Sequence, residues 1–168
     1  RHGAVNVMEY EANGYLPEDA KIFLNNAGHG LTYSTQWSQF KTNIGVRCAV
    51  PIDYNRDGRM DLVSCSFRNN RATLYRNTGS GWQDMTSINL GQLADAVAAD
   101  LDGNGIEDLV TADVNGASYR RGTSTGLAAS VRIWQAPSNA DGFDLAIGDL
   151  QGDGLPDIYP DYQAPEFH

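Results

Sequence analysis

The sequence has few basic residues and no long apolar run, and each shortage excludes a class of protein. Its 168 residues include 12 Lys and Arg against 21 Asp and Glu, so the formal net charge at pH 7 is −9. No basic stripe offsets this acidity, which argues against a nucleic-acid partner. Because no run approaches the roughly 18 apolar residues of a spanning helix, we predict no membrane span.

Signs of catalysis and of helical structure are also missing. The sequence contains no Ser, His and Asp in a catalytic order, no zinc signature and no isolated pair of carboxylates, so we predict that it is not an enzyme. No helical period is present, which excludes helical solenoids. The 18 glycines, the 10% aromatic residues and the short apolar runs between turn signals instead predict an all-β protein.

Three nine-residue segments, 53–61, 100–108 and 149–157, share one pattern of oxygen-bearing side chains. Such side chains occupy positions 1, 3 and 5, glycine occupies position 6, and aspartate occupies position 9. In a tightly coiled loop alternate side chains point inward, glycine permits the sharp turn, and the carbonyl of position 7 adds another oxygen. Acidic surface turns without an ion are the alternative. Three evenly spaced copies favour metal binding.

The expected metal is calcium, at three sites. No His or Cys is among the candidate ligands, and hard oxygens suit Ca²⁺ better than a transition metal, with Mg²⁺ a weaker alternative. Nine of the 21 acidic residues occupy ligand positions, so three bound ions would bring the net charge to about −3. An EF-hand needs Glu at position 12, where these loops have Ser64, Thr111 and Pro160. The residues that follow each loop are β-like, so we expect the loops to join strands.

A period of 47 to 49 residues between the loops matches the blades of a β-propeller. A second signature, a strand followed by a glycine-rich turn, occurs at 26–31 and again at 77–82. We predict an N-terminal strand or arm over 1–20, then three repeats over about 21–70, 71–118 and 130–162. Each blade should be a four-stranded antiparallel sheet. Segment 116–129 has no counterpart in the first repeat and is expected to be a long exposed loop.

Three to three and a half blades cannot close a ring. The expectation is therefore self-association, or additional blades from another chain or from a longer protein. The two cysteines, Cys48 and Cys65, flank the first loop almost symmetrically, so a hairpin would bring them within disulfide range. A pair of buried thiols is the alternative. We favour the disulfide, partly because millimolar calcium and oxidised cysteines both belong outside the cell.

The loops and glycine-rich turns together resemble the FG-GAP/VCBS repeats of integrin α-subunit-type calcium-binding β-propellers, over residues 21–161. The resemblance implies one set of side-chain ligands for each loop: Asp53, Asn55, Asp57 and Asp61; Asp100, Asp102, Asn104 and Asp108; Asp149, Gln151, Asp153 and Asp157. It also implies carbonyl ligands from Arg59, Ile106 and Leu155. Gln151 stands where the family has Asp or Asn, so the third site should be the weakest.

These features predict an extracellular, calcium-stabilised interaction module with a protein or glycan ligand, acting in adhesion or self-assembly. A carbohydrate-binding accessory region of a secreted polysaccharide-degrading enzyme is the alternative. Aromatic faces suit sugars. Trp82 and Trp134 lie in equivalent regions of the repeats, where packing is expected, so Trp37 is the one candidate for ligand contact.

Overall fold

Short strands separated by tight turns make up the computed structural model, which describes residues 4–7, 21–25, 30–38, 46–66, 72–85, 90, 93–137 and 141–163. For 4–7, 46–47, 66, 141–143 and 162–163 the description covers the backbone alone. The described residues form fifteen strands and no helix, which confirms the all-β prediction. Consequently no described helix has the length and hydrophobicity that crossing a membrane requires.

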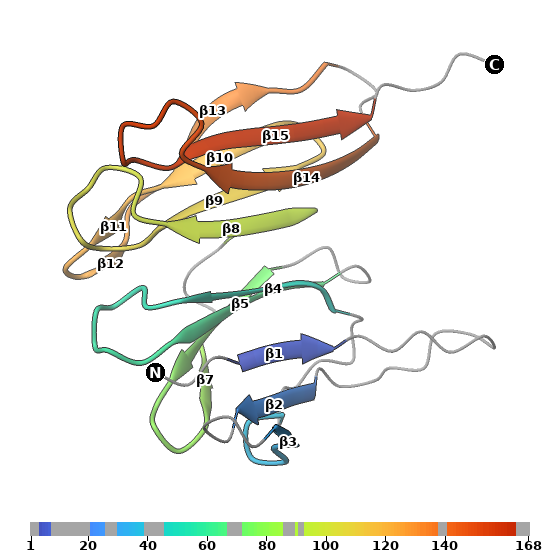
Figure 1. Cartoon of the computed structure of the whole chain (residues 1–168). Helices are drawn as coiled ribbons and strands as arrows, with labels where there is room; N and C mark the ends of the chain where they lie inside the picture. Colours follow the sequence, from blue (N-terminus) through green and yellow to red (C-terminus); the bar gives the residue numbers. More distant parts are fainter. Residues whose placement is uncertain are drawn as a thin grey trace, which may run out of the picture.

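The strands form four main antiparallel sheets, numbered here in chain order (Figure 1). The first sheet contains β1 (Ala4–Val7), β2 (Lys21–Asn25) and β3 (Leu31–Tyr33); the second contains β4 (Val46–Ile52), β5 (Asp61–Ser66), β6 (Ala72–Asn77) and β7 (Trp82–Asp84). The third contains β8 (Asp95–Ala99), β9 (Asp108–Asp113), β10 (Gly116–Arg120) and β13 (Val131–Gln135), and the fourth contains β14 (Asp141–Gly148) and β15 (Asp157–Gln163). A small ribbon pairs β11 (Gly122–Thr123) with β12 (Gly126–Leu127).

Two of the four sheets match the predicted four-stranded blade, while the first and the last contain three and two described strands. Each of the two complete sheets is a meander whose strands pair in order β4-β5-β6-β7 or β8-β9-β10-β13. The described strands do not close into a ring. The first two predicted sequence repeats each combine the last two strands of one sheet with the first two of the next. Most of the predicted arm over 1–20, and the turn at 26–29, lie outside the described residues.

The hydrophobic core lies in layers between the sheets. Ile22 of the first sheet packs on Tyr75 of the second. Between the second and third sheets, Val63, Leu74 and Leu109 are fully buried. A further cluster joins the third sheet to the fourth. Strands of the third sheet are therefore covered on both faces, and β9 is buried along nearly its whole length. This packing fixes each sheet relative to its neighbours and so positions the loops at the strand ends.

The disulfide prediction is confirmed, since Cys48 and Cys65 are bonded to each other. They are direct cross-strand partners on β4 and β5, with Cα atoms 4.9 Å apart. Cys65 is fully buried in the layer between the second and third sheets. The bond therefore ties the base of the hairpin that carries the first loop.

The expectation of a long exposed loop over 116–129 is wrong. This segment forms β10, the third strand of the third sheet, and then the β11–β12 ribbon. Gly116 is buried, and a Cβ atom there would lie 2.2 Å from the carbonyl oxygen of Trp134. Because only glycine allows this approach of β10 to β13, the glycine that suggested a loop instead permits a packed strand.

Candidate functional site

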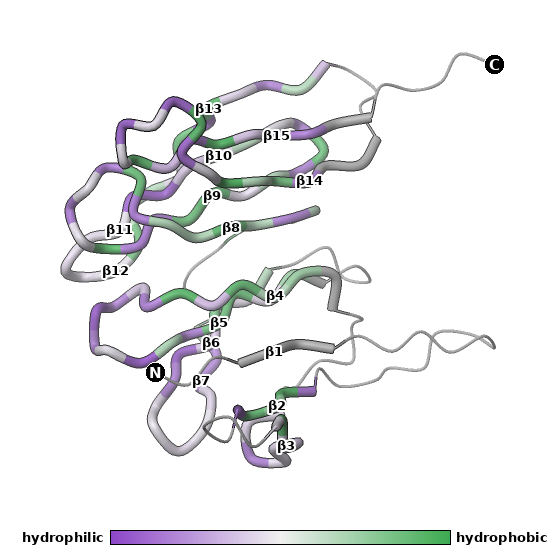
Figure 2. The backbone as a smooth tube through the Cα atoms, viewed as in Figure 1, coloured by the Kyte–Doolittle hydropathy of each residue, from purple (hydrophilic) through white to green (hydrophobic). Residues whose placement is uncertain are grey.

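All three predicted loops connect the two strands of an antiparallel hairpin. The first joins β4 to β5, the second joins β8 to β9, and the third joins β14 to β15. They lie on the same side of the molecule, at one end of the stacked sheets (Figure 1). Figure 2 shows these loops as largely hydrophilic segments beyond the more hydrophobic strands. The prediction that the loops join strands is confirmed.

The backbone of each loop turns through two left-handed residues. Position 6 is glycine in every copy, with φ between 78° and 86° at Gly58, Gly105 and Gly154. Position 4 is also left-handed, as Gly103 and Gly152 in two loops and as Arg56, with φ of 58°, in the first. A residue with a Cβ atom is strained in this region, so Arg56 is an exception within the repeated pattern.

The first aspartate of each loop organises the turn by accepting backbone hydrogen bonds at both carboxylate oxygens. One carboxylate oxygen accepts from the amide of position 5 and the other from the amide of position 6. The distances are 3.0 and 2.9 Å at Asp53, 3.0 and 2.7 Å at Asp100, and 3.1 and 2.8 Å at Asp149. These bonds lower the pKa of Asp149, with the Gly154 amide as the largest cause. The same scaffold therefore recurs three times from the same residue types.

Side chains at positions 3 and 5 turn inward along the same coil. The position 5 oxygen accepts from the amide of position 7 in each loop, at 3.0 Å from Arg59, 2.8 Å from Ile106 and 2.9 Å from Leu155. In the second loop the carboxylate oxygens of Asp100, Asp102 and Asp108 lie within 4.8 Å of one another. Three carboxylates at this spacing could hold a metal ion, and hard oxygens favour Ca²⁺.

The aspartate at position 9 is the most buried member of the first two loops. Asp61 and Asp108 are 1% and 0% exposed. Asp61 Oδ1 accepts the amide of Asn77, the last residue of β6, at 2.7 Å. Asp108 Oδ1 accepts the amide of Gly122, just after β10, at 2.6 Å. In both cases the donor lies at the end of the third strand of the same sheet. The glycine-rich turn at 77–82 and the β11–β12 ribbon thus support the loop beside them. This explains why a second signature accompanies the first in the sequence.

One oxygen of Asp61 is poorly satisfied. Its Oδ2 atom is buried and has no hydrogen bond of ordinary geometry among the described residues, although the neighbouring Tyr54 amide lowers the pKa of the carboxyl group. The equivalent oxygens of Asp108 and Asp157 accept the amides of Leu101 and Leu150 at 2.9 and 2.8 Å. Burial is the largest cause that raises the pKa of Asp61 to about 6, and the charges of Asp57 and Asp53 raise it further. A buried carboxylate beside other carboxylates is neutralised either by a proton or by a cation. The donor set of the first loop therefore fits a divalent ion.

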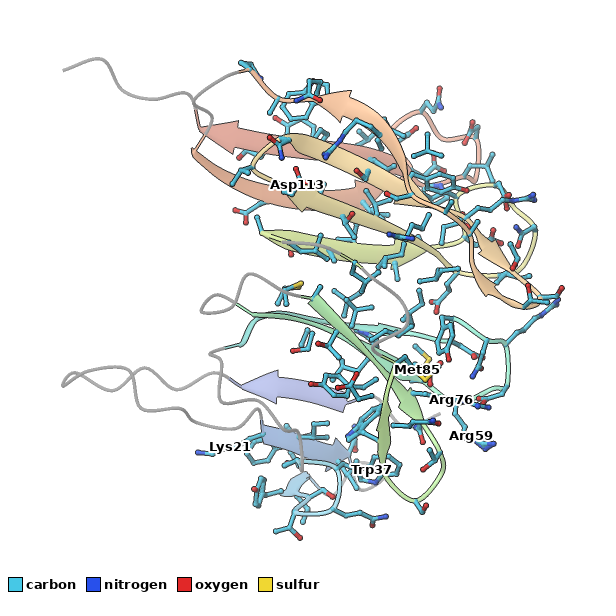
Figure 3. All side chains as sticks on the ribbon, turned by 180° about the vertical axis from the view of Figure 1, so that it is seen from behind. Lys21, Trp37, Arg59, Arg76, Met85 and Asp113 are labelled. Atoms are coloured by element: carbon cyan, nitrogen blue, oxygen red, sulfur yellow. A yellow bond between two sulfur atoms is a disulfide. The ribbon has the colours of Figure 1, made fainter. Side chains whose placement is uncertain are left out.

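Arginines neutralise part of the charge of the first two loops. Arg76 lies 3.5 Å from Asp57, at the same end of the second sheet as Arg59 (Figure 3). In the second loop Arg121 pairs with Asp102. Burial raises the pKa of Asp102, but the Arg121 and Asn104 hydrogen bonds outweigh it, so the net shift is downward. Each of these ion pairs holds one loop carboxylate in place and leaves the other ligand side chains of its loop without an arginine.

The third loop departs from the other two, as the sequence predicts for Gln151. Its amide Nε2 donates to Asp157 Oδ1 at 3.2 Å, whereas position 3 of the other loops accepts the amide of position 5. No third strand of the fourth sheet is among the described residues. The Gln151 amide therefore donates to the Asp157 oxygen, where Asp61 and Asp108 accept a backbone amide at the end of the third strand. Asp157 is only partly buried. The weaker affinity of this loop stays a prediction.

Trp37 has a packing partner. Its ring meets Trp82 edge to face with centroids 5.2 Å apart, and the Trp82 indole donates a hydrogen bond to its carbonyl at 2.8 Å. Both rings belong to the layer between the first and second sheets. Figure 3 shows Trp37 in the region of the first and second sheets. Ligand contact by Trp37 stays a prediction, and packing accounts for its position.

Sequence reasoning missed two bridging carboxylates. Glu107 accepts the backbone amide of Asp53 at 2.8 Å, which joins the second loop to the first. Asp95 accepts the amide of Leu145 at 2.9 Å, which joins the third sheet to the fourth. In the sequence both residues look like ordinary exposed acids, because their hydrogen-bond partners lie 54 and 50 positions away along the chain. The structure alone assigns them partners.

Comparison with known families agrees with the geometry. No curated protein matches the chain. The model of the FG-GAP-like repeat matches it twice, over residues 53–111 and 100–159, so that each match runs from one loop into the next. The two matches span well over half of the 168 residues. The chain therefore belongs to the FG-GAP-like repeat family.

Proposed function

We propose that the chain is a non-catalytic, extracellular interaction module whose three loops each bind Ca²⁺. The observation that carries this proposal is the convergence of one carboxylate oxygen each from Asp100, Asp102 and Asp108, which lie within 4.8 Å of one another on a loop scaffold that recurs three times. The ligands would be the side chains at positions 1, 3, 5 and 9 and the carbonyl at position 7 of each loop. Bound Ca²⁺ would supply positive charge that lets these carboxylates approach one another.

The Cys48–Cys65 disulfide supports an extracellular location for this module. Disulfides persist in oxidising compartments, and millimolar calcium is available there to sites of moderate affinity. In this setting the ions would be structural, since they would stiffen the hairpin ends of packed sheets. The surfaces of the sheets, rather than the loops, would then meet a protein or glycan.

Calcium stoichiometry tests the proposal. We expect isothermal titration calorimetry to give three Ca²⁺ per chain, with the weakest binding at the third loop. Asp53→Ala, Asp100→Ala and Asp149→Ala should each remove one site, because each deletes the carboxylate that organises its loop. Asp161→Ala, at an exposed aspartate outside the loops, should leave three. A chain that binds no calcium at millimolar concentration would contradict the proposal.

One face of the fourth sheet is suited to meet a partner. Residues matched by their distance from the first aspartate of each loop are Val63, Val110 and Tyr159, of which the first two are fully buried and Tyr159 is 58% exposed. Leu150, which matches buried Tyr54 of the first loop, is 74% exposed. In the second and third sheets the equivalent face is covered by the next sheet of the stack, whereas in the fourth sheet it is exposed. We assign it as the partner-binding face, with a second copy of the chain as the occupant.

The exposed ends of the stack support that choice of partner. The first sheet presents Leu31 and Tyr33, 53% and 47% exposed, at the opposite end of the stack. Tyr159→Arg should weaken self-association at least tenfold, because an arginine would be buried against an apolar sheet. Sedimentation velocity at about 1 to 100 µM protein would measure it. Val114→Arg, in the β9–β10 turn, is the control. A wild-type particle of 18.3 kDa at every concentration would exclude this partner.

A further inference from the structure

Two contacts connect the first loop directly to the second. Glu107 Oε2 accepts the backbone amide of Asp53 at 2.8 Å. The guanidinium of Arg56 also reaches the second loop, where a Cβ atom built on Gly105 would lie 3.8 Å from its Nη2 atom. Asp53 and Arg56 are positions 1 and 4 of the first loop, while Gly105 and Glu107 are positions 6 and 8 of the second. The backbone of Asp53, the first residue of the first loop, is therefore held by a side chain of the second loop.

Glu107 stands between two residues that the second site would itself fix. Ile106 supplies the proposed carbonyl ligand and is 9% exposed, and Asp108 supplies the position 9 carboxylate and is fully buried. The peptide between them is confined by the β11–β12 ribbon, because a Cβ atom on Gly122 would lie 2.2 Å from the Glu107 carbonyl oxygen. An ion held by residues 106 and 108 would restrain the backbone of Glu107 from both sides, and with it the position of the carboxylate.

The link is specific to the first two loops. Position 8 of the third loop is Pro156, which has no acceptor side chain, and position 8 of the first loop is Met60. The third loop meets the second through an apolar contact, in which Leu155 Cδ2 lies 3.5 Å from the Cβ position of Gly103. A hydrogen bond has a direction that depends on the conformation of its acceptor, whereas an apolar contact tolerates small shifts.

We infer that Glu107 is a positioning residue that couples calcium binding at the first loop to calcium binding at the second. An ion in the second loop fixes Glu107, Glu107 fixes the Asp53 amide, and the first loop then binds its ion with less ordering of its backbone. Linkage makes the coupling reciprocal, so occupancy of either loop raises the affinity of the other by the same factor. The third loop binds independently. The inference rests on the proposed calcium sites and adds their cooperativity.

The test uses the full chain with the third loop inactivated by Asp149→Ala, so that calorimetry reports two sites. Asp100→Ala should lower the affinity of the first loop about tenfold, and Asp53→Ala should lower the affinity of the second by the same factor. Adding Glu107→Ala should remove this dependence, leaving the first loop equally weak with or without an active second loop. Glu107→Gln keeps an oxygen acceptor without the charge, so it should retain the coupling. Asp95→Ala, which deletes the other bridging carboxylate, is the matched control and should leave the coupling intact.

Outcomes separate this inference from the calcium proposal. Absence of calcium binding in the wild-type chain would overturn both. Two bound ions whose affinities do not depend on each other would overturn the coupling alone. If coupling persists in Glu107→Ala, or disappears equally in Glu107→Gln, the hydrogen bond is not its cause. The reciprocal measurement with Asp53→Ala and Asp100→Ala needs no change at Glu107, so it tests the coupling even if Glu107→Ala does not fold, and Glu107→Gln then tests its cause.

Discussion

Chelation of calcium should lower the melting temperature of the chain by on the order of 15 to 30 °C. Each ion that binds only the folded state adds about 2.7 kcal/mol at a free concentration a hundredfold above its dissociation constant, so three ions add about 8 kcal/mol. One kcal/mol shifts the melting temperature of a domain of this size by about 2 to 4 °C. Without the ions, nine ligand carboxylates are left to repel one another at the ends of the hairpins.

Circular dichroism in excess EGTA, and at a free calcium concentration about a hundredfold above the dissociation constants found by calorimetry, would measure this shift. Magnesium at the same concentration should restore little of the stability, because it dehydrates reluctantly and seldom occupies all-protein cages. A chain with Asp53, Asp100 and Asp149 all changed to Ala is the control, and EGTA should leave its melting temperature unchanged. Equal melting temperatures of the wild-type chain in EGTA and calcium would contradict structural calcium.

What the sequence predicted correctly is short-range. The hydrogen bonds that shape each loop join residues two to five positions apart, such as Asp100 to the amides of Asn104 and Gly105. A pattern of nine residues therefore contains the information for the turn, and the β-rich runs beside it define the hairpin. The Cys48–Cys65 pairing follows from that hairpin, because the two residues are nearly equidistant from the loop that the strands flank.

What the sequence did not reveal depends on contacts between distant segments. Gly122 is needed because the ribbon approaches the carbonyl of Glu107, and nothing near residue 122 announces that approach. Glu107 and Asp95 are single acids whose partners lie 54 and 50 positions away. The repeat period predicts that sheets recur along the chain. It does not specify which side chains cross between them, since the residues equivalent to Glu107 are Met60 and Pro156 in the other two loops.

Asp61→Asn should stabilise the calcium-free chain at pH 7 and destabilise the calcium-loaded one. Burial, together with the charges of Asp57 and Asp53, raises the pKa of Asp61 from 3.8 to about 6 in the folded state. The folded chain therefore binds this proton more tightly than the unfolded chain, so the contribution of Asp61 to the free energy of unfolding falls as pH rises from about 4 through 6. Above that window the buried charge costs on the order of 3 kcal/mol, which asparagine avoids.

Calcium should reverse the sign because, at the proposed first site, it would bind the ionised form of this buried carboxylate. Asparagine offers that ion a neutral amide, so the variant loses the first site and its linked stability. Urea unfolding in EGTA should show the variant gaining over wild type between pH 4 and pH 7, and in calcium at pH 7 it should be the less stable protein. Asp161→Asn, at an exposed position of β15, should show neither effect. An Asp61→Asn variant that is less stable than wild type in EGTA at pH 7 would mean that the buried carboxylate contributes hydrogen bonding in excess of its desolvation cost, and that its burial is not evidence for a cation.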